Sequence, residues 1–173
     1  RAGAIAYCHS GYRPEAVKQA YAQSGSGGFY LRNSSGEVTF QGNCVPQANG
    51  LRQMDFSPVK AEGWYTLEVD GKKSRPFRIG REAYIPAVWK TLNFFFSERC
   101  GFDVPGIHTE CHMDVMSVHP DGRRLPVCGG WHDAGDLTQA AINTAESVFA
   151  MLELAIAERE AQPELSQRAK EEA

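Results

Sequence analysis

The hydrophobic pattern changes its period near residue 80, and this change constrains the fold more than any other feature of the sequence. Before this point, apolar residues alternate in short runs such as Trp64–Val69, and turn residues separate the runs. Alternation with a period of two indicates strands with one buried face. From Tyr84, apolar residues recur every three or four positions, which is the period of an amphipathic helix. We therefore expect a β-sandwich over residues 1–80 and a helical domain over residues 81–173.

The charge pattern changes at the same place. Residues 1–80 carry 10 basic and 6 acidic side chains, whereas residues 81–173 carry 8 basic and 15 acidic ones. The basic residues of the first half are scattered and form no block, which argues against nucleic acid as a partner. No apolar run reaches the roughly 20 residues that a transmembrane helix needs. The longest candidate, Ile142–Ile156, is interrupted by charged and amide side chains, so we expect no membrane span.

Two turn signals predict strand pairing in the first domain. Residues 29–40 contain two short apolar stretches on either side of Asn33–Gly36, a pattern typical of a hairpin. The strand that ends at Val69 runs into Asp70-Gly71, the dipeptide that type I′ turns favour. We expect the chain to return as a strand over Lys72–Ile79. Pro76 implies an edge position or a strand start there, because proline cannot donate a ladder hydrogen bond.

The second domain is expected to contain three helices. Gly101 could cap the end of the first helix. An irregular stretch then runs to residue 135, and loops of such length are uncommon unless they are functional or cross-linked. The second helix is predicted to start at Asp136, since Asp136 and Gln139 resemble a capping box. Pro163 suits the first turn of a third helix, which reaches the last residue without a cap and is therefore expected to be cut there.

A glycine-rich turn before the second helix carries two carboxylates, Asp133 and Asp136. At a helix N-cap, backbone N–H donors and the helix dipole favour the ionised form of a carboxyl group. An ionised Asp136 could act as a general base on water, and Asp133 could position that water. Trp131 offers a flat apolar surface for a sugar ring. The alternative is that Asp136 only caps the helix and Asp133 is an ordinary loop residue.

The irregular stretch also contains four potential metal ligands: Cys100, Cys111, His112 and His132. Two thiolates and two imidazoles would complete a tetrahedral zinc site with a structural role. The alternative is a disulfide, Cys100–Cys111 or Cys111–Cys128, with histidines on the surface. The chain has five cysteines, which cannot all pair with one another. Because the spacing fits no standard zinc finger, the residues alone leave both interpretations open.

Several stretches together resemble one known family. The motif Gly130–Asp136 closely resembles the DAGD motif of glycoside hydrolase family 9, the cellulase family with an (α/α)6 barrel. Leu92–Gly101 looks like that family's first catalytic helix with its RCG turn. Residues 1–80 resemble the immunoglobulin-like domain that precedes many of these barrels. The matching stretches in that domain are Gly11–Pro14, Met54–Ser57, Gly63–Tyr65 and Ser74–Phe77.

The fold that the resemblance implies is an N-terminal immunoglobulin-like β-sandwich followed by the first α-helices of a truncated (α/α)6 barrel. The implied activity is inverting hydrolysis of β-1,4-glucan linkages, as in cellulose. Asp136 would be the general base that activates water and Asp133 its partner, whereas the general-acid glutamate would lie outside these 173 residues. The 173 residues alone are therefore expected to be inactive.

The resemblance also bears on metal ions. Members of this subgroup are similar in carrying a structural zinc held by two cysteines and two histidines. These ligands match Cys100, Cys111, His112 and His132. The resemblance leaves room for a calcium ion in the part of the catalytic domain that lies outside this sequence.

Two departures from the family pattern concern the substrate. Leu137-Thr138-Gln139 follows DAGD where the family usually has an aromatic or small residue and a Lys-Tyr pair, and Cys128 stands where cysteine is uncommon. The alternatives are an exo-β-glucosaminidase or xyloglucan-active relative or, from a different class, a non-catalytic carbohydrate-binding or interaction module. We expect a β-glucan oligo- or polysaccharide as substrate, the remainder of the catalytic domain as a partner, and a secreted or periplasmic location.

Overall fold

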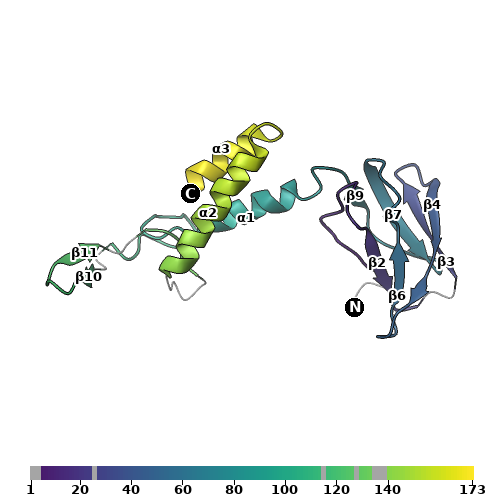
Figure 1. Cartoon of the computed structure of the whole chain (residues 1–173), viewed down its shortest axis with the longest axis horizontal. Coiled ribbons are helices and arrows are strands. Elements are labelled where there is room, and N and C mark those ends of the chain that lie inside the picture. The colour runs from purple at the N-terminus through teal and green to yellow at the C-terminus, as the bar shows by residue number, and fades with distance from the viewer. Residues whose placement is uncertain (1–4, 25–26, 114–115, 127–128, 134–139) are drawn as a thin grey trace. The chain divides into compact units, whose positions relative to one another are not determined.

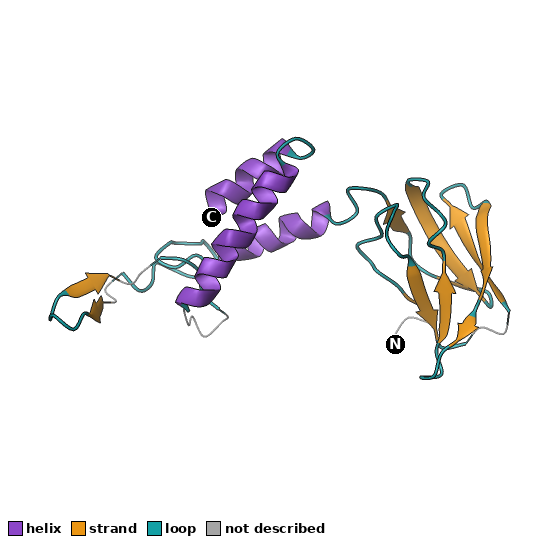
Figure 2. Cartoon of the chain, in the orientation of Figure 1, coloured by secondary structure: helices purple, strands orange, loops and turns teal. Residues whose placement is uncertain are grey.

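The computed structural model describes residues 5–24, 27–113, 116–126, 129–133 and 140–173. The chain divides into two compact units, residues 1–87 and 88–173 (Figure 1). The first unit is built from strands, and the second is mainly helical (Figure 2). The structural division falls after Ala87, within the first helix, whereas the change in period predicts a domain boundary at residue 80.

The first unit is a sandwich of two antiparallel sheets, as the alternating pattern predicts. One sheet has the order β1 (Ile5–Ala6), β2 (Gln19–Ala22), β6 (Arg52–Asp55) and β5 (Val45–Pro46). The other has the order β4 (Val38–Asn43), β3 (Gly28–Asn33), β7 (Gly63–Val69) and β8 (Lys72–Lys73), and β9 (Phe77–Ile79) also pairs with β7. Every second side chain of β3 and β7 points inward. Phe29, Leu31 and Leu67 meet Ala20 and Met54 in one buried core.

Both predicted turns form. The side-chain oxygen of Asn33 accepts the N–H groups of Ser35 and Glu37 at 3.0 Å each, which closes the β3–β4 turn. In the β7–β8 turn, Asp70 has a φ of 48° and Gly71 a φ of 71°, as the two central residues of a type I′ turn require. The predicted return strand is split into β8 and β9. Pro76 directly precedes β9, which confirms its place at a strand start.

The opening loop of the first unit is fastened to β9. The N–H of Tyr12 donates to the carbonyl oxygen of Arg78 at 2.9 Å. Gly11 has a φ of +96°, and a Cβ at this position would lie 2.2 Å from that same oxygen, so only glycine fits. The hydroxyl of Tyr12 donates to the carbonyl oxygen of Gln19 at 2.8 Å. Burial of the phenol raises the pKa of Tyr12 to about 12.

The second unit contains the three predicted helices: α1 (Ile85–Ser97), α2 (Ala141–Glu158) and α3 (Pro163–Glu172). Pro163 occupies the first helical turn of α3, as predicted. The helices α2 and α3 pack side by side, and the Ser166 hydroxyl donates to the carbonyl oxygen of Ala155 at 2.6 Å. A hairpin of β10 (Met116–Val118) and β11 (Arg124–Pro126) forms where irregular chain was expected. Among the described residues, no helix is both long and apolar enough to cross a bilayer.

The predicted end of α1 is wrong. The helix ends at Ser97, well before Gly101. Residues 98–100 leave the helix and pair in antiparallel fashion with residues 130–132. Gly101 does have a positive φ of +70°, but it serves the turn after this pairing and not the helix cap. A long-range backbone pairing therefore overrides the local signal.

The predicted start of α2 is also wrong. The helix begins at Ala141, and its N-cap residue Ala140 has an extended backbone without a side-chain cap. Asp136 and Gln139 lie outside the described residues. The apolar period of α2 begins only at Ile142, so it does not locate the first turn.

One apolar stripe of α2 is exposed in this chain. Phe149 is 67% exposed and Leu152 43%, and Ile142 and Ile156 on the same stripe are also exposed. These residues are separated by seven, three and four positions and therefore lie along one helix face.

Candidate metal centre and the adjoining pocket

Backbone pairing brings the two ends of the long irregular stretch together. The N–H of Cys100 donates to the carbonyl oxygen of Gly130 at 2.9 Å, and the N–H of His132 donates to that of Glu98 at 2.8 Å. Cys100 and His132 therefore stand on adjacent extended segments despite their separation in the sequence. Both side chains are buried.

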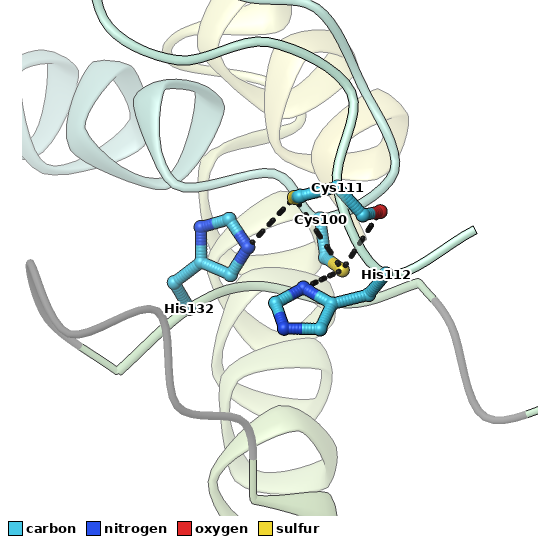
Figure 3. A group of neighbouring side chains, drawn as sticks. All are labelled: Cys100, Cys111, His112 and His132. Atoms are coloured by element: carbon cyan, nitrogen blue, oxygen red, sulfur yellow. Dashed lines mark hydrogen bonds between the residues drawn. The ribbon is translucent and has the colours of Figure 1, made fainter. Parts of the chain in front are cut away.

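The four predicted ligands converge on one point (Figure 3). The Cys100 and Cys111 Sγ atoms lie 4.0 Å apart, Cys100 Sγ lies 3.4 Å from His112 Nδ1, and Cys111 Sγ lies 3.1 Å from His132 Nε2. All four ligand atoms lie within 4.8 Å of one another. A tetrahedron with Zn–S bonds of about 2.3 Å and Zn–N bonds of about 2.0 Å has edges of roughly 3.3 to 3.8 Å. The cluster therefore has the size and the donor set of a closed metal site.

These distances also bear on the disulfide alternative. A separation of 4.0 Å between the Cys100 and Cys111 sulfurs is about twice a disulfide bond length. No disulfide joins the four cysteines that the structure describes: Cys8, Cys44, Cys100 and Cys111. Cys128, the other partner considered for Cys111, lies outside the described residues. The Cys100–Cys111 disulfide is therefore not formed in this structure.

The loop that carries His112 has an unusual backbone. His112 adopts a φ of 55°, in the left-handed region that residues other than glycine seldom occupy. Such conformations persist where the surrounding structure fixes them, and they often mark functional sites. The conformation here accompanies the approach of the imidazole to the Cys100 sulfur (Figure 3).

His132 is held in the form that binds metals. Burial lowers the pKa of His132, the neighbouring His108 and His112 lower it further, and Glu98 partly opposes them. The neutral imidazole is the form that coordinates an ion. Its Nδ1 atom finds no hydrogen-bond partner among the described residues, and the Glu98 Oε2 atom lies 3.9 Å away. Metal-bound histidines commonly direct this second nitrogen at a carboxylate.

His108 contacts both the end of α1 and the metal cluster. Its Nε2 lies 3.0 Å from the carbonyl oxygen of Ser97, the last residue of α1, and its Nδ1 lies 2.9 Å from that of Thr109. Helix-end carbonyls need such partners. The His108 ring also stands edge-on to the His132 ring, with centroids 5.1 Å apart. An isolated histidine gives no sequence signal for contacts of this kind.

A pocket of about 240 Å³ adjoins the metal cluster on the side of Asp133. Its lining includes Phe95, Trp131, Asp133, Asn143, Thr144 and Ser147. Asp133 is exposed, and its Oδ1 accepts the Asn143 amide at 3.2 Å. Aromatic and polar groups of this kind suit a sugar. Asp136, the predicted base, lies outside the described residues.

Trp131 is more buried than a sugar platform would be. It is 8% exposed, its ring packs edge-on against Phe95 with centroids 5.3 Å apart, and its indole N–H donates to Glu172 at 2.9 Å. The indole N–H is therefore committed inside the protein. A role for Trp131 in substrate binding stays a prediction.

Glu172 is the charged residue that sequence reasoning missed. An acidic run on a helix is ordinarily solvated, but the Glu172 side chain is fully buried. Burial raises its pKa, yet hydrogen bonds from Arg99 and Trp131 and the charges of Arg99 and Arg168 outweigh that effect, so the pKa is lowered overall. One signal was available, because Glu172 follows the buried Leu165 and Ala169 at helical spacing.

Two models of known protein families match this chain. Residues 84–173 match the family model described as glycosyl hydrolase family 9, and residues 8–74 match the cellulase N-terminal ig-like domain. The chain belongs to glycosyl hydrolase family 9. Its first unit accordingly corresponds to the N-terminal immunoglobulin-like domain of cellulases.

Individual endoglucanases are similar over most of this chain. Endoglucanase C of Cellulomonas fimi is 30% identical over 154 residues, which cover 71% of this chain and 14% of that protein. A mutant thermostable endoglucanase from Alicyclobacillus acidocaldarius has a TM-score of 0.70 and 31% identity over 88% of this chain. A Zn-binding triple mutant of a family 9 endoglucanase has a TM-score of 0.65 and 30% identity over 85% of this chain. This chain spans 30% and 31% of these two solved structures.

Proposed function

We propose that these residues form the N-terminal part of an inverting glycoside hydrolase that cleaves β-1,4-glucan linkages of the cellulose type. The observation that carries this proposal is the match of residues 84–173 to the family 9 model. The pocket beside Asp133 adds support, because it combines aromatic rings with polar groups.

The proposed mechanism assigns one role to each carboxylate. Asp136 takes a proton from water as that water attacks the anomeric carbon, and Asp133 orients the water. A glutamic acid elsewhere in the complete enzyme protonates the leaving oxygen on the other side of the bond. Inversion needs both groups in one site. The 173 residues should therefore show no hydrolysis on their own, and measurable turnover of a β-glucan by them would refute this division of roles.

The metal centre is proposed to hold a structural zinc ion. The ligands would be Cys100, Cys111, His112 and His132. Two thiolates and two imidazoles fill the four positions of a zinc tetrahedron, so no position remains for water or substrate. The ion would tie the end of α1 to the segment that precedes Asp133. Its contribution would be rigidity of that segment and not chemistry at the glycosidic bond.

The assignment of the base can be tested in the complete enzyme. Asp136→Asn should lower kcat by about 10²- to 10⁴-fold and leave KM nearly unchanged, because an amide cannot accept the proton from water. The matched control is Asp103→Asn, which makes the same change at an exposed residue of the second unit. Near-normal kcat in Asp136→Asn would assign the base to another residue.

The substrate alternatives can be separated with the same protein. Comparison of turnover on cellulose-type glucan, xyloglucan and β-glucosaminide oligomers distinguishes the proposed activity from that of a xyloglucan-active or exo-acting relative. Binding without turnover on all three would favour a carbohydrate-binding or interaction module. We also propose a secreted or periplasmic location, because an insoluble glucan must be met outside the cytoplasm.

A further inference from the structure

One buried carboxylate joins three elements of the second unit. Arg99 donates to Glu172 through two nitrogen atoms, Nε to Oε1 at 3.0 Å and a terminal nitrogen to Oε2 at 2.9 Å. The Trp131 indole N–H donates to Oε1 at 2.9 Å, and the Arg168 guanidinium forms an ion pair with Oε2 at 2.8 Å. Both oxygens of Glu172 are therefore fully used. A buried carboxylate with fewer partners would be costly.

The partners of Glu172 are adjacent to the metal ligands. Arg99 directly precedes Cys100, and Trp131 directly precedes His132. Arg99 and Trp131 are also the residues that bridge the two antiparallel segments. The carboxylate therefore binds one side chain from each segment and lies at the point where the segments pair.

The Arg99 side chain is itself held in a fixed position. Its guanidinium lies over the Phe96 ring at 5.0 Å and over the Phe102 ring at 5.3 Å. A planar guanidinium that is stacked on rings and bound through two nitrogens has little freedom to turn. Movement of Glu172 would therefore move the backbone beside Cys100 and not merely a flexible side chain.

We propose that Glu172 is a positioning residue that fixes the spacing between the segments carrying Cys100 and His132. The last turn of α3 thereby sets the geometry of the metal centre and of Asp133, which follows His132. The relevance to metal binding and catalysis rests on the proposed function. Glu172 aligns the two segments whether or not a metal ion is bound.

Amide hydrogen exchange in the complete protein tests this proposal without relying on activity. The test variant is Glu172→Gln, which keeps an acceptor oxygen for the indole N–H but loses the charge that binds the two arginines. The matched control is Glu171→Gln, the same change at an exposed neighbour. We expect the amides of Cys100 and His132 to exchange at least about tenfold faster in Glu172→Gln and within about twofold of wild type in the control.

The opposite result is equally clear. If exchange rises only within α3 while the amides of Cys100 and His132 stay at the wild-type rate, Glu172 merely stabilises its own helix and the proposal is wrong. Glu172→Ala removes every contact and should exceed the effect of Glu172→Gln. Should the alanine variant fail to fold, the glutamine variant still decides the question.

A second measurement addresses the metal. Competition with a chelator should show zinc bound about 10- to 100-fold more weakly by Glu172→Gln than by wild type, as for other residues that orient metal ligands. Wild-type protein that binds no zinc would refute the metal assignment but would leave the exchange result valid. Failure of the proposed function and failure of this proposal are therefore distinguishable.

Discussion

Replacement of Cys111 by serine is the sharpest test of the metal centre. The Cys111 sulfur lies 3.1 Å from His132 Nε2 and 4.0 Å from the Cys100 sulfur, so it occupies one corner of the cluster. Cys111 is half-buried, and serine fits in its place without overpacking. A neutral hydroxyl is a poor zinc ligand. Cys111→Ser should therefore lose the ion while the surrounding backbone stays intact at low temperature.

The expected loss of stability follows from loop closure. An ion bound to both Cys100 and His132 closes a loop of about 30 residues, and a cross-link of this length lowers the entropy of the unfolded chain by an amount equivalent to about 3–4 kcal/mol. The free energy of unfolding of the second unit should fall by up to that amount. Wild-type protein treated with a chelator should lose the same amount.

Urea unfolding followed by far-ultraviolet circular dichroism measures this loss, because α2, α3 and most of α1 lie in the second unit. Elemental analysis of the same samples gives the zinc content. Cys44→Ser is the matched control: it removes a half-buried thiol of the first unit, should cost about 1 kcal/mol and should leave the zinc content unchanged. Wild-type protein with less than about a tenth of an equivalent of zinc, together with a Cys100–Cys111 disulfide detected by mass, would refute the reasoning.

Three further predictions concern stability and surface. Gly11→Ala should lower the free energy of unfolding by about 3–5 kcal/mol in urea titration, because its Cβ meets a backbone oxygen at 2.2 Å. The control Gly36→Ala, which has a positive φ but open space around the Cβ, should cost about 1 kcal/mol. Equal losses in the two variants would contradict the steric argument. The pKa of Tyr12 is raised to about 12, so the free energy of unfolding should be constant below pH 10 with respect to this group and fall by about 2–3 kcal/mol as the pH rises to 12. An absorbance titration in which every tyrosine ionises near pH 10 would be inconsistent with the burial of Tyr12. In this chain, the double variant Phe149→Ser with Leu152→Ser should bind less hydrophobic dye than the unchanged chain, with a nearly equal free energy of unfolding, since both side chains are exposed. A large loss of stability would show that this helix face is packed.

Local chemistry explains the features that the sequence predicted well. The hairpin around Asn33–Gly36 and the turn at Asp70-Gly71 depend on residues that tolerate or stabilise a tight turn. Pro163 at the start of α3 depends only on the backbone of the first helical turn. The set of metal ligands could also be proposed, because cysteine thiolates and histidine imidazoles are the usual ligands of structural zinc. All of these inferences rest on residue types and near neighbours.

Only the tertiary structure decided how the candidate site is held together. The residues alone left a disulfide and a metal centre open. The 4.0 Å separation of the Cys100 and Cys111 sulfurs shows that these two cysteines are not bonded to each other in the structure. Glu172 belongs to an acidic run in the sequence but lies buried, because Arg99 and Trp131 reach it from distant parts of the chain. The helix α1 ends before its predicted position for the same reason. A local signal such as a helix cap contributes about 1 kcal/mol. The pairing of distant segments combines several hydrogen bonds and buried charges, and no local pattern specifies their partners.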